Sequence, residues 1–256
     1  MNRRLSDEPP RLLFLHLPKT AGSTLRRIIE RQYGEAAWKF TGPTADSLQT
    51  WNDLPHQRRH ATRALVGHLP YGLHELLPWP VRYMTILREP VDRIISHFAY
   101  AARIPASPLS AQVAATGHSL RRYVEETPAS QFFNNGQTRL IGSKNLLHAP
   151  PADRATLDRA KERLSSSFSV VGLTDRFDET LAIIARDLEW ADVATQPPEK
   201  VSANRVSVNA LPDEDRQVIA DHNALDAELY AFARDLFESR AARQQNVGPI
   251  PTAPLR

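Results

Sequence analysis

The 256-residue sequence contains no cysteine. Without thiols the chain has no disulfide framework, no thiolate nucleophile and no Cys-ligated zinc site. We therefore expect a cytoplasmic protein.

Long apolar runs are also absent. The run that begins at Leu12 stops at His16, whereas a membrane-spanning helix needs about 18 or more apolar residues in succession. The sequence therefore predicts neither a membrane span nor a signal peptide.

Hydrophobic residues make up 41% of the chain, with 10 glycines and 20 prolines, which is typical of a globular protein. We expect one domain over 1–256 with a flexible Pro-rich tail at about 245–256.

The sequence has little excess of either charge. A formal net charge of +3 does not suit a protein that must neutralise many phosphates, so we expect no nucleic-acid partner. Lysine is scarce, because only five of the 32 basic residues are lysine and the other 27 are arginine. A lysine in a motif is therefore more informative than an arginine.

What the sequence does contain is a series of short apolar runs, each followed by a turn and a helical pattern. Strands are expected at 11–17, 64–68, 81–87 and 169–173, with helices beginning near 25, 90 and 178. This alternation predicts an α/β fold with a P-loop-like, mostly parallel sheet flanked by helices on both faces. Ligands bind such sheets at the carboxyl ends of the strands, so we expect the chemistry just after Leu17, His68 and Leu87.

The other segments have weaker patterns. Residues 33–63 are expected to be irregular or partly helical, and the middle of the chain to hold helices at 120–126 and 151–164 with loops between. The longest helical pattern covers 212–240.

The loop after the first strand reads LPKTAGST, from Leu17 to Thr24. Its small residues allow backbone N–H groups to point at an anion at the start of the following helix, and Lys19 adds a positive charge. A nucleoside-triphosphate loop would instead read G-x-x-x-x-G-K-[ST]. A small-residue turn with a solvated lysine is the alternative.

The third strand ends at Arg88, and Pro90 suits the first turn of a helix. Ser96 lies eight residues after Arg88, about two helical turns along, so the two side chains could face one phosphate. By itself this spacing is equally consistent with a surface arginine and an unremarkable serine.

Taken together, these two segments resemble a known family. LHLPKTAGSTL is similar to the loop that binds the 5′-phosphosulfate of 3′-phosphoadenosine 5′-phosphosulfate (PAPS), and LREPVDRIISHF is similar to the segment that binds its 3′-phosphate. Their order and spacing resemble sulfotransferases related to heparan sulfate 2-O-sulfotransferase, including bacterial relatives. Weaker similarity continues through 171–184 and from Lys200 to Asp226.

The resemblance implies a role for each matching residue. His68 falls where the family has its catalytic base, although some relatives have a second histidine where this chain has Val66. The segment 200–205 would cover the nucleotide, and the lack of cysteines and of a membrane anchor argues for a bacterial cytosolic enzyme. The residues implied for the 5′-phosphosulfate are Lys19, Thr20, Ala21, Gly22, Ser23 and Thr24, and those for the 3′-phosphate are Arg88 and Ser96.

Sulfuryl transfer to a hydroxyl fits these roles chemically. The reaction needs an in-line approach, removal of the hydroxyl proton and stabilisation of charge on the departing oxygen. A neutral His68 suits the proton transfer, and Lys19 with nearby N–H groups suits the leaving group, so no metal is required. His16, His74 and His97 are expected to be structural.

The resemblance suggests a saccharide hydroxyl as the acceptor. A polar run at Asn135, Gln137 and Arg139 either faces the acceptor or forms a helix-capping turn. Several arginines could line a cleft for an anionic glycan: Arg58, Arg59, Arg63, Arg103, Arg121, Arg122 and Arg139.

Two rival functions stay open at this point. A nucleotide-dependent kinase would share the strand, loop and helix, but the sequence lacks the expected order of glycine and lysine. A noncatalytic nucleotide-binding protein of the same fold would not need His68. The sequence gives no indication of the oligomeric state.

Overall fold

The computed structural model describes residues 10–41, 45–68, 71–104, 107–127, 133–143, 150–190, 193 and 207–246. Its centre is one parallel sheet with the strand order β2-β3-β1-β4-β5. The strands are β1 (Arg11–Leu15), β2 (Ala37–Phe40), β3 (Ala64–Gly67), β4 (Val81–Leu87) and β5 (Phe168–Leu173). The predicted α/β fold is confirmed, and all the strands but β2 match predicted runs.

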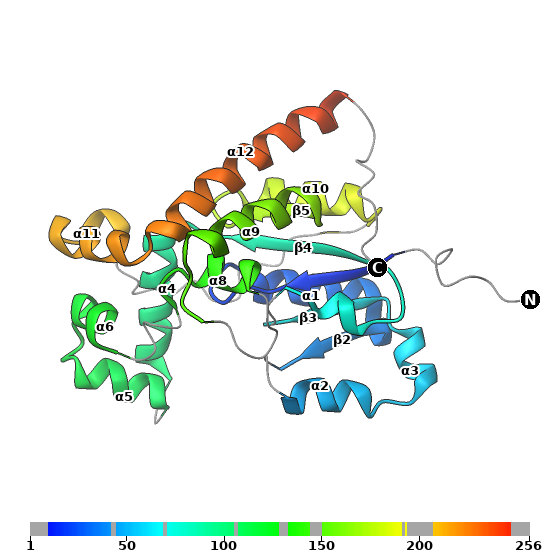
Figure 1. Cartoon of the computed structure of the whole chain (residues 1–256), viewed down its shortest axis with the longest axis horizontal. Coiled ribbons are helices and arrows are strands. Elements are labelled where there is room, and N and C mark those ends of the chain that lie inside the picture. The colour runs from blue at the N-terminus through cyan, green and yellow to red at the C-terminus, as the bar shows by residue number, and fades with distance from the viewer. Residues whose placement is uncertain are drawn as a thin grey trace, which may run out of the picture.

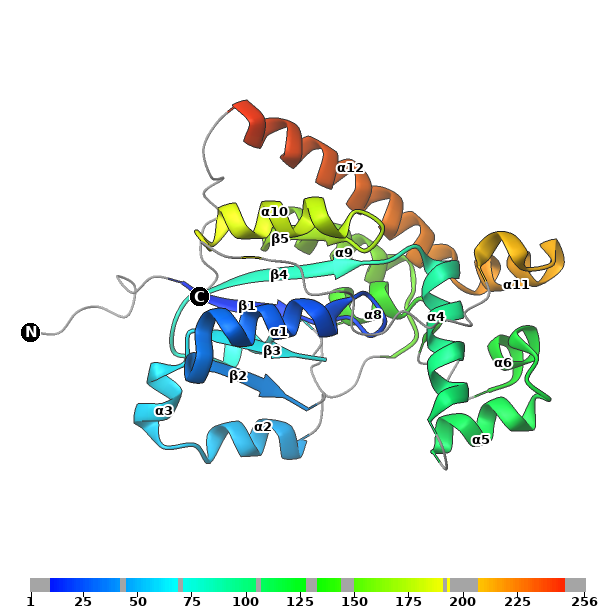
Figure 2. The ribbon, with the colours of Figure 1, turned by 180° about the vertical axis from the view of Figure 1, so that it is seen from behind.

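Helices cover both faces of this sheet (Figures 1 and 2). On one face lie α1 (Gly22–Tyr33) and α10 (Phe177–Asp187), and on the other lie α8 (Gly136–Gly142), α9 (Arg154–Ser166) and α12 (Ala224–Asn246). Helix α1 buries its apolar side, including Leu25, Ile28 and Ile29, against the strands. This burial of a periodic apolar stripe is what fixes each helix on the sheet.

The carboxyl ends of the strands point toward a second group of helices, which contains α4 (Pro90–Arg103), α5 (Pro108–Ala115), α6 (Leu120–Glu126) and α11 (Asp213–His222) (Figure 1). Helix α4 begins directly after β4. Pro90 occupies its first turn, and the Glu89 carboxylate accepts hydrogen bonds from the N–H groups of Val91 and Asp92. These caps start α4 immediately beyond Arg88.

The segment 33–63 is more regular than predicted. It contains β2, α2 (Ala45–Asn52) and α3 (His56–Ala61), with the short helix η2 (Gly34–Ala36) before β2. Strand β2 has only four residues, and Trp38 and Phe40 both pack on Trp51 with ring centroids 5.8 Å apart. An edge strand this short leaves too little alternation to be predicted from sequence.

Two further predictions need correction. The predicted helix over 212–240 is two helices, because Asn223 leaves the helical conformation between α11 and α12. Helix α12 also continues to Asn246, so the first two residues of the predicted tail are helical and 247–256 lie outside the described residues. The helices α5 and α8 were not predicted. The short helices η3 (Leu73–Leu76) and η4 (Val208–Ala210) complete the described elements.

None of the helices in the described part of the chain is both long and apolar enough to cross a membrane.

Candidate functional site

Three predicted segments meet at one edge of the sheet. Strand β1 lies between β3 and β4, with Leu15 beside Gly67 and Phe14 beside Met84. The loop after β1, His68 after β3 and Arg88 after β4 therefore emerge side by side. The three segments expected to carry the chemistry thus lie together at neighbouring carboxyl ends of parallel strands.

The loop after β1 has an unusual backbone. Lys19 and Ala21 both have positive φ, at 70° and 59°, a conformation that L-residues rarely adopt. The Thr20 hydroxyl donates a hydrogen bond to the Leu17 carbonyl at 2.9 Å and is fully buried. Because that hydroxyl holds the loop together, the ligand role predicted for Thr20 depends on its backbone N–H. Because Lys19 and Ala21, on either side of Thr20, are left-handed, successive backbone N–H groups of the loop turn toward one side. Known anion sites have the same arrangement.

Helix α1 begins at the end of this loop. Ala21 is its N-cap and offers no side-chain cap, and the first turn has no acidic residue. The N–H groups of Gly22 and Ser23 therefore begin the helix at its positive end. A Cβ on Gly22 would lie 1.9 Å from Cδ2 of His16, so only glycine fits there.

The Lys19 side chain reaches α4. Its ammonium lies 4.2 Å from the centroid of the Tyr100 ring, a cation–π contact. Tyr100 is two helical turns from Asp92, with Ser96 between them on the same side of the helix. The lysine is thus at the same side of α4 as the predicted phosphate residue Ser96.

His68 is held by the carbonyl of His16. Its Nδ1 lies 2.7 Å from that oxygen. Since a carbonyl oxygen only accepts, Nδ1 carries the proton, and Nε2 has a free lone pair. Burial lowers the pKa of His68 from its ordinary value, the His16 carbonyl opposes this, and the charges of Lys39 and Arg26 lower it further. At neutral pH the imidazole is therefore uncharged.

The other histidines near the motifs are buried, in keeping with the structural role expected of them. His16 lies with its ring 4.1 Å from the His68 ring, and burial, with the positive charges around it, lowers its pKa to about 2. His74 Nδ1 lies 3.1 Å from the Tyr83 hydroxyl. His97 Nε2 lies 2.9 Å from the Tyr123 hydroxyl, and burial lowers its pKa to about 3. The side chains of these three histidines are therefore part of the packing around the site.

Arg88 connects the loop to α4. Its Nη1 donates to the Lys19 carbonyl at 3.0 Å and its Nε to the Asp92 carboxylate at 2.6 Å. Ser96 lies one helical turn beyond Asp92 and is partly exposed. Asp92 was not among the predicted residues. A phosphate bound by Arg88 and Ser96 would share the Arg88 guanidinium with the Asp92 carboxylate.

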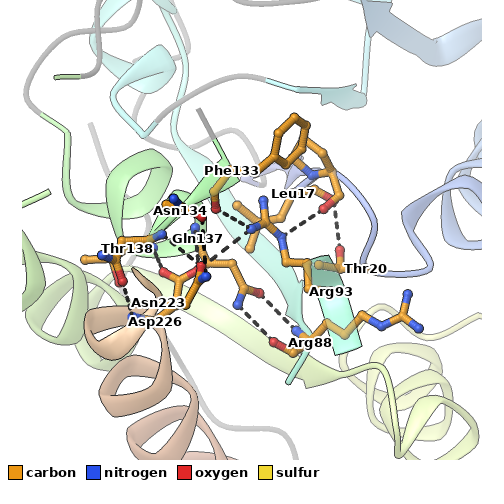
Figure 3. A network of polar contacts seen from close by, with 12 residues as sticks. Leu17, Thr20, Arg88, Arg93, Phe133, Asn134, Gln137, Thr138, Asn223 and Asp226 are labelled. Carbon is orange, nitrogen blue, oxygen red and sulfur yellow. Dashed lines mark hydrogen bonds and ion pairs between the residues drawn. The ribbon is translucent and has the colours of Figure 1, made fainter. Parts of the chain in front are cut away.

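A buried amide fixes the backbone of Arg88 (Figure 3). The Gln137 side chain accepts from the Arg88 N–H at 3.0 Å and donates to the Arg88 carbonyl at 2.9 Å. Gln137 is fully buried and Arg139 is nearly so, and Asn135 is the N-cap residue of α8. Of the two interpretations of this run, the turn that begins a helix is therefore the one observed.

A second buried group joins four segments (Figure 3). Arg93 donates from Nε to the Pro18 carbonyl and from Nη1 to the Phe133 carbonyl, both at 3.1 Å. Its Nη1 lies 3.7 Å from the carboxylate of Asp226, and both side chains are at most 1% exposed. Asp226 also accepts from the N–H groups of Gln137 and Thr138. The β1 loop, α4, α8 and α12 are thus tied together.

The comparison with known families decides the relationship. The model of the galactose-3-O-sulfotransferase family matches residues 3–247. The chain belongs to this family. The predicted resemblance to sulfotransferases is thereby confirmed in its broad form.

Curated relatives agree with the family match. Galactose-3-O-sulfotransferase 3 of Bos taurus is 29% identical over 93% of this chain and 60% of its own length, and the Homo sapiens protein gives the same values. Heparan-sulfate 6-O-sulfotransferase 2 of Gallus gallus is 28% identical over 90% of this chain and 67% of its own length. The chain therefore spans about three fifths of the galactose-3-O-sulfotransferases that it matches.

A solved structure was also matched. It is mouse sulfotransferase SULT7A1 complexed with PAP, which is 15% identical and has a TM-score of 0.44 over 87% of this chain and 66% of that chain. At that distance no residue role is transferred from it.

The arginines expected to line an acceptor cleft lie in different parts of the fold. Arg58 and Arg59 are on α3, before the amino end of β3, and the Arg59 carbonyl accepts from Arg11 at the start of β1. Arg121 and Arg122 are on α6, where each pairs with a glutamate one turn along. These seven arginines therefore do not form a single cluster, because several lie at the opposite end of the strands or are already paired. Arg63 directly precedes β3, Arg103 ends α4, and Arg139 is buried.

The remaining expectations concern the segment over the nucleotide and a metal site. The segment 200–205, expected to cover the nucleotide, lies outside the described residues. Among the described residues no three His, Asp or Glu side chains are grouped as a metal site would require.

Proposed function

We propose that this protein transfers a sulfuryl group from PAPS to a hydroxyl of a carbohydrate, with His68 as the general base. The observation that carries the proposal is the state of His68, whose Nδ1 donates to the His16 carbonyl so that Nε2 is free to accept a proton. The imidazole follows β3 directly, beside the loop that begins α1. The family's curated relatives are named for galactose and heparan sulfate, which supports a saccharide acceptor.

The loop is suited to the 5′-phosphosulfate of the donor. Lys19 supplies a full positive charge, and the N–H groups of Thr20, Ala21, Gly22, Ser23 and Thr24 belong to the loop and the positive end of α1. Arg88 and Ser96 would hold the 3′-phosphate, with Gln137 keeping the Arg88 backbone in place.

The proposed reaction balances without a metal. Nε2 of His68 takes the proton of the acceptor hydroxyl, whose oxygen forms a bond to sulfur while the bond from sulfur to the phosphate oxygen breaks. The negative charge left on that phosphate is stabilised by Lys19 and the N–H groups of the loop. The protonated imidazole keeps its hydrogen bond to the His16 carbonyl, which favours the charged form.

The direct test is incubation of the purified protein with PAPS and a panel of neutral and anionic oligosaccharides, read by mass spectrometry. We expect one added sulfate on at least one oligosaccharide and release of adenosine 3′,5′-bisphosphate (PAP), in the presence of EDTA as well as in its absence. Phosphate transfer from ATP that requires magnesium would identify a kinase and overturn the proposal.

Finer points of identity are part of the same proposal. We propose a bacterial source, kinship with the heparan sulfate 2-O-sulfotransferases as well as with the matched families, and a cytoplasmic location. The lack of cysteine among the 256 residues is compatible with that location. Fractionation of the source cells with an antibody against the protein would test the location, and recovery from the membrane or secreted fraction would contradict it.

A further inference from the structure

Two positive side chains flank His68 on one face of the sheet. Lys39 pairs with Val66 across β2 and β3, and Phe40 pairs with Gly67, so His68 follows directly beyond this pairing. Side chains alternate along a strand, and Trp38 and Phe40 point to Trp51 on α2. Lys39 therefore points to the opposite face, the one that α1 covers (Figure 2).

Arg26 approaches the same place from α1. It lies in the second turn of the helix, near the end from which the phosphate loop enters. The positive charges of Lys39 and Arg26 both lower the pKa of His68 and that of the adjacent His16, in keeping with these positions on β2 and α1. Charges affect a pKa in this way only over a short range.

The two cations are held differently. Arg26 donates to both carboxylate oxygens of Glu30 at 2.6 and 2.7 Å, one helical turn along α1. Lys39 is exposed, and no hydrogen bond or ion pair joins its ammonium to another of the described residues. With Glu30 counted, the group around His68 has a net positive charge.

We propose that Lys39 and Arg26 form a subsite for an anionic group, a carboxylate or a sulfate, on the saccharide whose hydroxyl His68 deprotonates. This inference rests on the proposed function. It differs from the cleft expected at first, because neither cation belongs to the arginines considered there. An anion at this subsite would place the acceptor beside the free Nε2 and offset the positive charge that disfavours protonation of His68.

The experiment compares three acceptors that differ in their anionic groups. The first is a tetrasaccharide of alternating glucuronate and N-acetylglucosamine, the second is the same compound with its carboxyls reduced to alcohols, and the third is the reduced compound with N-sulfate in place of N-acetyl. We expect a lower KM for the first or third compound than for the second, and a difference that shrinks at high salt. Preference for the first identifies a carboxylate, and preference for the third a sulfate.

Variants then assign that preference to the two cations. Lys39→Glu is expected to raise the KM of the preferred anionic acceptor roughly 5- to 20-fold with kcat and PAP affinity little changed. Arg26→Gln should raise this KM less, because the Arg26 guanidinium is already hydrogen-bonded to Glu30. Glu30→Gln should lower the KM, because the substitution removes the carboxylate that pairs with Arg26. Arg27→Gln removes a charge from an exposed neighbouring position of α1 and is the matched control, for which we expect no change.

A second measurement reports on the cations without any acceptor. Lys39→Glu should raise the pKa of His68, followed by NMR titration of its ring protons, because a charge that lowers the pKa is replaced by one that raises it. Arg27→Gln should leave that pKa unaltered.

The outcomes separate this inference from the function on which it rests. If the protein sulfates the neutral compound as readily as the anionic ones, or if Lys39→Glu leaves every KM unchanged, the subsite is refuted and the sulfotransferase stands. If PAP binds but none of the three compounds is sulfated, the saccharide subsite is refuted as well. If PAP does not bind at all, the proposed function itself fails.

Discussion

At the scale of single residues, one hydrogen bond determines which nitrogen of His68 can act. The His16 carbonyl holds the proton on Nδ1, and burial with the nearby cations lowers the pKa of the ring. Catalysis needs the neutral imidazole, so activity should fall only when the pH drops below the lowered pKa. We expect the acid limb of kcat/KM to have its midpoint below about 6.5, the ordinary value for histidine.

That profile is measured with PAP affinity followed in parallel by calorimetry, so that loss of nucleotide binding at low pH is not mistaken for protonation of the base. A midpoint above 7 would mean that a different group titrates.

Gly22 offers a steric test of the phosphate loop. Gly22→Ala places a Cβ 1.9 Å from the ring of His16, so the ring or the start of α1 must move. We expect PAP affinity to fall by roughly tenfold or more, as measured by calorimetry. Gly34, past the other end of α1, has positive φ but no atom within 4 Å of such a Cβ, so Gly34→Asn is the control. Equal PAP affinity in both variants would show that the loop tolerates the displacement.

At the scale of secondary-structure elements, the site depends on the junction of the β1 loop, α4, α8 and α12. Asp226→Ala would leave Arg93 buried without its carboxylate and would remove the acceptor for two N–H groups of α8. Breaking such a pair costs about 3–5 kcal/mol of unfolding free energy. Chemical denaturation would measure the loss.

The matched control for this variant is Asp213→Ala on α11, because Asp213 is an exposed partner of Arg216. Removal of a surface ion pair should change the unfolding free energy by at most about 1 kcal/mol. A similarly small effect of Asp226→Ala would contradict a supporting role for the junction.

The same junction shows how far the sequence could predict the site. The strands that precede Lys19, His68 and Arg88 are buried apolar runs, which are readable because each ends in a proline or a polar turn. Arg93 and Asp226 are far apart in the chain, and nothing local marks either as a partner of the other. Gln137 was noticed for its polarity, but only the fold shows that its amide binds the backbone of Arg88.

At the scale of the whole molecule, buried histidines make stability depend on pH. Their pKa values are lowered to about 2 for His16 and about 3 for His97, against about 6.5 in an unfolded chain. Below pH 6.5 the unfolded state therefore takes up protons that the folded state does not. Each of these histidines should reduce the unfolding free energy by up to about 1.4 kcal/mol per pH unit, from pH 6.5 down toward its own pKa.

Thermal or denaturant unfolding between pH 7.5 and 4.5 measures this dependence. His97→Phe should make the decline shallower, whereas His222→Gln, at an exposed position of α11, should leave its slope unaltered. Stability that is constant over this range would mean that these histidines are not buried in the neutral form.

The proposed reaction depends most on His68 as the base. The most direct measurement is single-turnover transfer of sulfate from PAPS by His68→Ala, together with the affinity of the same variant for PAP. We expect transfer to slow by roughly 10²–10⁴-fold while PAP affinity stays close to that of the unmodified protein. Full transfer activity in this variant would contradict the assignment of the base and, with it, the proposed mechanism.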